Sequence, residues 1–220
     1  MRFVSGSASS SDDEEEKDLR DAWRRRVRPD NQIPITLGTA FLLARTDDLA
    51  VAISALRVYA NGLEFTVSAR SRGDVAGQGL LLSGFGGHRP RGQHGSVDRF
   101  LLGFEFSDGR SVTNVESWPP ALPDVDDHDG PWLTNGGGGG SDRVADHDFF
   151  LAPLPPGERL TLVGAWPSLG IAEFRQAFDA VAIRAAAAQV IELWPPQLDA
   201  DDPEPPPSPV VPPGSWFERN

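Results

Sequence analysis

The chain has 220 residues, a formal net charge of −12 and no cysteine. This length can bury a sizeable core, and the lack of cysteine excludes disulfides, thiolate nucleophiles and cysteine-ligated metals. Residues 120–158 hold eight acidic residues against one arginine, and without a basic stripe nucleic acid is not an expected partner.

Signals for membrane insertion and secretion are not found in the sequence. No apolar run approaches the roughly 18 residues that a membrane-spanning helix needs, and the opening MRFVSG is too short an apolar start for a secretory signal. Cytoplasmic residence without a membrane span is therefore the default expectation.

The N-terminal tail is predicted to carry one short, charged amphipathic helix. Ser11 and Glu14 fit a capping box, and the acids that come early and the arginines that come late both suit the helix dipole. These features predict a helix from about Asp13 to Arg25, which ends before Pro29.

The clearest local signal is a β-hairpin in the stretch LRVYANGLEFTVSAR, which follows an apolar strand predicted over residues 35–44. The Asn61-Gly62 pair strongly indicates a two-residue turn, because both central residues of a type I′ turn need positive φ. The predicted strands are residues 49–59 and 63–71.

This turn also predicts which residues of the hairpin face each other. Val58 should face Phe65 on an apolar side, and Tyr59 should face Glu64 on a polar side that lies in water. The alternation of apolar residues changes phase near Ser54, which predicts either a β-bulge or a strand that crosses from one sheet to another.

A second hairpin is predicted in RFLLGFEFSDGRSVTNV, with four apolar residues on one face: Phe100, Leu102, Phe104 and Phe106. Its turn contains Asp108-Gly109. A two-residue turn and a three-residue turn with Gly109 in the left-handed conformation are equally compatible with the sequence.

The segment PPALPDVDDHDGPWLTNGGGGGSDRVADHD is predicted to be a long, acidic, mobile surface loop. Its acids and histidines also make it the candidate metal site, with five proposed ligands: Asp126, His128, Asp129, His147 and Asp148. The calcium-loop template fails, since Val125 and Gly136 would stand where carboxylates are required. A plain solvated loop is the preferred interpretation, and no cofactor is predicted.

Two of four tryptophans near the ends of predicted elements have both a structural and a functional interpretation, and the other two have a structural one. Trp118 and Trp132 lie in predicted loops, where they either anchor the loop ends beside prolines or bind a ligand by stacking. Trp166 and Trp194 end predicted strands and are expected in the core.

The last third of the chain is predicted as strands around one helix. Strands are expected over residues 149–154 and 159–166, joined by a tight turn at Pro155-Pro156-Gly157. Residues 171–178 are predicted as a strand, with a helix as the open alternative. Asp179 is placed as the N-cap of a helix over residues 180–188, and a final strand follows over 190–194.

The stretches PLPPGERLTLVGAWPSLGIAE, LRVYANGLEFTVSAR and AAAAQVIELWP resemble a group of uncharacterised actinobacterial proteins of similar length. The resemblance covers about residues 33–196. It implies no activity and no site residues, because none is known for that group.

Together these patterns predict a mainly β protein, an antiparallel β-sandwich of immunoglobulin-like or jelly-roll-like type with one short helix. The sandwich is expected over residues 30–196, between an N-terminal tail over 1–29 that carries the short charged helix and an acidic, proline-rich tail over 197–220, and the tails are expected to be disordered outside that helix. The predicted function is a non-enzymatic binding or assembly module, with a protein partner or self-association. The alternative is a metal-dependent enzyme or a metal-binding protein with its site in the Asp/His loop over 124–148.

Overall fold

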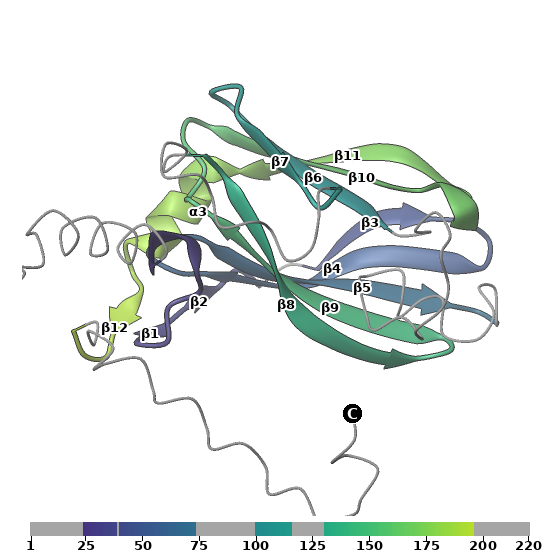
Figure 1. Ribbon diagram of the computed structural model, residues 1–220, viewed down its shortest axis with the longest axis horizontal. Coiled ribbons are helices and arrows are strands. Elements are labelled where there is room, and N and C mark those ends of the chain that lie inside the picture. The colour runs from purple at the N-terminus through teal and green to yellow at the C-terminus, as the bar shows by residue number, and fades with distance from the viewer. Residues whose placement is uncertain (1–23, 39, 74–99, 116–129, 196–220) are drawn as a thin grey trace, which may run out of the picture.

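The structure is a computed structural model that describes residues 24–38, 40–73, 100–115 and 130–195 (Figure 1). Within these ranges the chain is mainly β, with antiparallel strands throughout, as the sequence predicts. Two sheets form the two layers of a sandwich, and the predicted fold class is confirmed.

The large sheet has the strand order β2-β4-β5-β9-β8, with β3 also paired to β4. Its strands are β2 (Ile35–Thr36), β3 (Phe41–Arg45), β4 (Leu49–Val58), β5 (Leu63–Ser71), β8 (Trp132–Ser141) and β9 (Val144–Ala152). The small sheet has the order β11-β10-β6-β7. Its strands are β6 (Leu101–Phe106), β7 (Ser111–Thr113), β10 (Arg159–Trp166) and β11 (Ile171–Asp179).

Most of the remaining elements gather at one end of the sandwich (Figure 1). There β1 (Gln32–Ile33) and β12 (Ile191–Glu192) form a two-stranded ribbon, and helix α3 (Ala180–Ala187) follows β11 directly. At the opposite end a 3-10 turn, Pro167–Leu169, joins β10 to β11 (Figure 1).

The core lies between the two sheets and is built mainly from rings. Phe65 of the large sheet stacks on Phe149 with ring centroids 5.6 Å apart, and it meets the edge of Phe104 from the small sheet at 5.3 Å. Trp166 is fully buried, as predicted, and contacts Phe100. The alternating apolar residues of both predicted hairpins therefore point into one shared core.

The first hairpin forms where it is predicted, but its register is displaced by two residues. Val58 pairs with Leu63 instead of Phe65, and Arg57, not Tyr59, pairs with Glu64. The central residues of the turn are Ala60 and Asn61 in place of Asn61 and Gly62, since the Tyr59 N–H donates to the Gly62 carbonyl. Because side chains alternate with period two, this displacement leaves each residue on its predicted face.

The phase change near Ser54 is a β-bulge. The pairing of β4 with β5 shifts between Ile53 and Ala55, so that no residue of β5 stands opposite Ser54 in the strand register. Of the two explanations that the sequence leaves open, the bulge is the one that the structure shows, since β4 stays in one sheet throughout.

The second hairpin has the three-residue turn. Glu105 pairs with Ser111, and the Phe106 N–H donates to the Arg110 carbonyl across the turn. Gly109 has φ +89°, in the left-handed region that glycine adopts without strain.

The prediction of a mobile loop is wrong for the second half of that segment, because residues 132–148 form β8 and the start of β9. Residues 137–140 pair one by one with β9, Gly136 lies at a shift in the register, and the strand continues into a turn at Asp142-Arg143. A Cβ at Gly138 would overlap the Asp146 carbonyl and the His147 ring, so glycine is what allows β8 to lie this close to β9. Five consecutive glycines show no side-chain alternation, which is why the sequence does not reveal the strand.

Other predictions for the C-terminal third are largely confirmed. Residues 171–179 form a strand, and the Asp179 carboxylate caps α3 by accepting from the Val181 and Ala182 N–H groups. The strand predicted over 35–44 is divided into β2 and β3, and the final strand is only two residues long. Trp194 was expected in the core but is half exposed beside β12.

Candidate functional site

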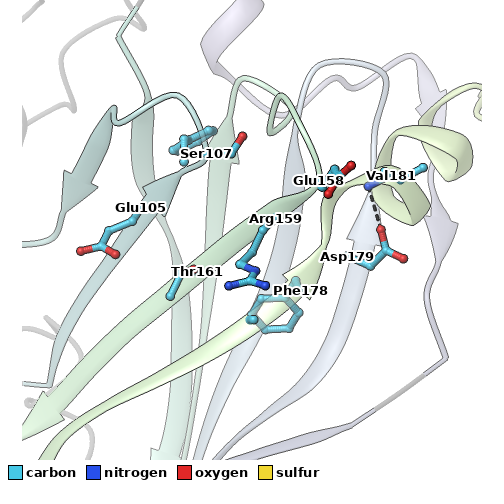
Figure 2. A pocket seen from close by; sticks show the side chains of 10 residues that line it. Glu105, Ser107, Glu158, Arg159, Thr161, Phe178, Asp179 and Val181 are labelled. Atoms are coloured by element: carbon cyan, nitrogen blue, oxygen red, sulfur yellow. Dashed lines mark hydrogen bonds between the residues drawn. The ribbon is translucent and has the colours of Figure 1, made fainter.

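An open depression of about 860 Å³ lies on the outer face of the small sheet (Figure 2). It is lined by residues of β6, β10 and β11, by the residue after β6 and the residue before β10, and by the first turn of α3. The full lining is Glu105, Phe106, Ser107, Glu158, Arg159, Thr161, Ala177, Phe178, Asp179 and Val181. Concave surfaces with a few converging polar groups are where proteins most often bind small ligands.

The depression exists because small side chains meet at the centre of the sheet face. Thr161 of β10 pairs with both Glu105 of β6 and Ala177 of β11. Directly paired residues point to the same side of a sheet, so the two small residues form a low floor next to the longer Glu105. Arg159 and Asp179 form the pair two residues further along the same strands, on the same face, and Arg159 lies at the end of this floor.

The polar groups around the floor include both donors and acceptors. Figure 2 shows Glu105 at one side and Asp179 at the other, with Thr161 and Arg159 between them. Arg159 has no ion-pair partner among the described residues, whereas Glu105 accepts from Arg175 at 2.6 Å. One oxygen of Asp179 accepts the cap hydrogen bonds, which leaves its second oxygen available to a ligand.

These lining residues are not among those that the sequence predicts. The lining residues of the sheet lie on three strands, and Glu105 and Asp179 are 74 positions apart in the sequence. Thr161 and Ala177 are unremarkable until the register of β10 against β11 places them side by side. No local motif marks them, because the hollow results from pairing.

A second polar cluster surrounds Glu64 on the outer face of the large sheet. Glu64 was predicted to lie in water, but it is only 3% exposed. Its carboxylate accepts from Arg28 at 2.5 Å, Arg57 at 2.7 Å and the Tyr59 hydroxyl at 3.1 Å. Burial acts to raise the pKa of Glu64, but the hydrogen bonds from Arg57 and Arg28 and their charges lower it below its ordinary value.

The proposed metal ligands do not converge within the part of the chain that is described. Asp126, His128 and Asp129 lie outside the described residues. His147 and Asp148 are consecutive in β9 and point to opposite faces of the large sheet. Asp148 accepts from the Thr66 hydroxyl, and no three metal-ligating side chains of the described ranges come together.

His147 points to the inner face of the sheet, between Ala145 and Phe149, and is 4% exposed. Its ring is hydrogen-bonded to Asn135 and lies 5.0 Å from the ring of Phe149. Burial lowers the pKa of His147, although the charge of Asp148 acts in the opposite direction. The imidazole is therefore neutral in the folded protein near pH 7.

This buried histidine is expected to destabilise the protein as the pH falls. The unfolded chain takes up a proton near pH 6.5, and the folded chain does so only at lower pH, so stability is fully present above about 6.5 and declines below it. Urea denaturation at pH 7.5 and 5.5 would show a smaller decline in His147→Gln. An equal decline in both proteins would mean that His147 is protonated as easily when folded as when unfolded.

Of the two tryptophans proposed as ligand-binding residues, the structure describes Trp132 only. Trp118 lies outside the described residues. Trp132 is half-buried at the start of β8, on the outer face of the large sheet, and the guanidinium of Arg26 lies 5.3 Å from its ring centre. Trp132 therefore contacts a cation of its own chain.

The charge of the chain is unevenly distributed. The described residues contain 13 arginines and 13 acidic residues, so their formal charge is zero and the net charge of −12 belongs to the other parts of the sequence. Either candidate surface thus belongs to a sandwich whose described residues carry no net charge.

Comparisons with known proteins give no relative. No family model, curated protein or solved structure matches the chain, so the resemblance to actinobacterial proteins stays a prediction. Within the described ranges, no helix combines the length and apolar character that crossing a membrane requires.

Proposed function

We propose that the protein is a non-enzymatic binding module and that the depression on the small sheet is its ligand-binding surface. The observation that carries the proposal is the floor of Thr161 and Ala177 between longer polar side chains. It provides a concave surface on a rigid sheet, and sites on strands are held more precisely than sites on loops.

The chemistry of the lining favours a ligand with many hydroxyl groups, such as a carbohydrate. Arg159 and Thr161 supply donors, and Glu105, Glu158 and Asp179 supply acceptors. Each ligand hydroxyl can donate to a carboxylate and accept from a guanidinium, so one ligand can use both kinds of group. The exposed Val181 adds an apolar surface at one wall, against which a sugar ring can pack.

The test compares two variants that add the same charge to the same strand. Ala177→Arg fills the floor of the depression, whereas Ala172→Arg places an arginine at an exposed position of β11 that does not line it. A glycan array identifies carbohydrates that bind the wild-type chain, and changes in NMR chemical shifts confirm the binding. These carbohydrates are expected to bind Ala177→Arg at least about tenfold more weakly, a loss of about 1.4 kcal/mol of binding free energy.

Ala172→Arg should retain the wild-type affinity. Equal binding by both variants would place the ligand elsewhere on the molecule. An array without a single reproducible ligand at millimolar affinity would contradict the assignment to carbohydrates.

A further inference from the structure

Residues 24–31, here called the strap, lie over the outer face of the large sheet, on the other side of the sandwich from the depression. The Asn61 side-chain amide donates to the carbonyls of Arg24, Arg25 and Val27, at 3.2, 3.1 and 2.8 Å. Arg28 binds Glu64, and the guanidinium of Arg26 covers the ring of Trp132. The strap therefore contacts the sheet and its first hairpin through two arginine side chains and three backbone carbonyls.

An aromatic cluster lies on this face, apart from the main core. Tyr59, Phe150 and Ala152 are buried together, and the rings of Tyr59 and Phe150 meet edge to face with centroids 5.9 Å apart. Trp132 pairs with Ala152 and so joins the same face. The Tyr59 hydroxyl donates to the carboxylate that also binds Arg28, so the strap, the aromatic cluster and Glu64 are in direct contact.

The contacts of Arg26 and Arg28 are those by which proteins recognise arginine. A guanidinium over an indole ring gains cation–π attraction, and a guanidinium on a carboxylate gains a charge-assisted hydrogen bond. Asp148 lies on the same face and adds a further negative charge near Arg28. Trp132, Glu64 and Asp148 thus form a surface that holds arginine side chains.

The strap is held by side-chain contacts and not by strand pairing with the sheet. It makes no ladder of backbone hydrogen bonds with the sheet, and 58% of the Arg28 side chain is exposed, so its ion pair is screened by water. Two buried polar atoms beside it, Trp132 Nε1 and Asn61 Oδ1, have no hydrogen-bond partner among the described residues. An imperfectly paired contact of this kind opens locally well before the fold does.

We propose that this face binds arginine-bearing peptide segments of a protein partner and that the strap occupies it in the free chain as an autoinhibitory contact. A partner segment would place one arginine on Trp132 and another on Glu64. It could also supply the acceptor that Trp132 Nε1 lacks. The proposal concerns a different surface from the carbohydrate depression and stands independently of it.

The test uses the full chain and a fluorescent peptide of the sequence RRRVRPDN, which is residues 24–31. In the wild type the strap competes from within the chain at a high effective concentration, so the peptide binds weakly. Arg28→Ala removes one anchor of the strap and is expected to bind the peptide at least tenfold more tightly. Arg45→Ala, which removes an exposed arginine from β3, is the charge-matched control and should bind like the wild type.

Two further variants locate the binding surface. Adding Trp132→Ala to Arg28→Ala should abolish the gain, and Glu64→Gln in the same background should do the same. Far-ultraviolet circular dichroism and the melting temperature establish whether each variant is folded. If the variant with Glu64→Gln does not fold, the variant with Trp132→Ala is enough to locate the binding surface. Hydrogen exchange over residues 24–33 should be faster in Arg28→Ala, while exchange in β5 and β9 is unchanged.

The proposal is overturned if folded Arg28→Ala binds the peptide no better than the wild type. Equal binding of a peptide in which lysine replaces every arginine would also overturn it, since attraction between charges alone would then explain the affinity. A concentration-dependent dimer of Arg28→Ala would mean that strap exchange between copies, not a partner segment, fills the surface.

Discussion

Replacing Phe65 with alanine is expected to lower the free energy of unfolding by about 3–5 kcal/mol. The side chain is 1% exposed and its ring lies against Phe149 of the same sheet and Phe104 of the opposite sheet. Truncation would leave a cavity between the two layers, because rings on both sides keep the sheets apart and prevent collapse. Urea denaturation followed by tryptophan fluorescence measures the change.

Leu42→Ala is the matched control for this substitution. Leu42 also stands on a strand of the large sheet, but it is 59% exposed, and its truncation should change the unfolding free energy by no more than about 0.5 kcal/mol. Similar small effects of both substitutions would show that Phe65 does not join the two sheets.

Gly138→Ala is expected to destabilise the protein by about 2 kcal/mol or more, because a methyl group at this position has no room. Its Cβ would overlap the Asp146 carbonyl and the His147 Nδ1 atom, and would lie 3.0 Å from the His147 Cα. Backbone atoms of β9 cannot rotate away as a flexible side chain can. Strand β8 would therefore have to separate from β9 over several residues.

The neighbouring Gly139 provides the control, since it differs only in its surroundings. A Cβ at Gly139 meets nothing within 4 Å, and its φ is not in the left-handed region. Gly139→Ala should leave stability unchanged or raise it by up to about 1 kcal/mol, because alanine restricts the unfolded chain. If both substitutions are harmless in thermal and urea denaturation, then β8 does not pack against β9 as described.

The first hairpin shows where local prediction ends. The turn signal correctly locates the hairpin and the faces of its strands, yet Asn61 and Gly62 serve purposes that come from elsewhere in the chain. Asn61 donates to carbonyls of the strap, and a Cβ at Gly62 would collide with the Leu151 carbonyl and the ring of Phe150. The turn is centred one residue earlier than its sequence suggests, and the register follows the turn.

The two candidate surfaces could not be predicted from the sequence, because they too depend on contacts with other parts of the chain. Glu64 alternates with apolar neighbours as an exposed residue would, yet it is buried, and one of the groups that bind its carboxylate is Arg28 of the strap, 36 residues earlier in the chain. The depression depends on Thr161 and Ala177 being paired, which requires the register of two strands. Both features depend on contacts between segments that are distant in sequence.

The sequence by itself determined the mainly β fold, the inward faces of the hairpins, the change of phase near Ser54 and the cap of α3 by Asp179. Each of these depends on side-chain alternation or hydrogen bonding within a few residues, which the order of residues specifies directly. Only the tertiary structure decided that the glycine run is a strand, that Glu64 is buried and that small residues hollow the outer face of the small sheet. These depend on how closely distant strands approach, and that is settled by packing across the whole sandwich.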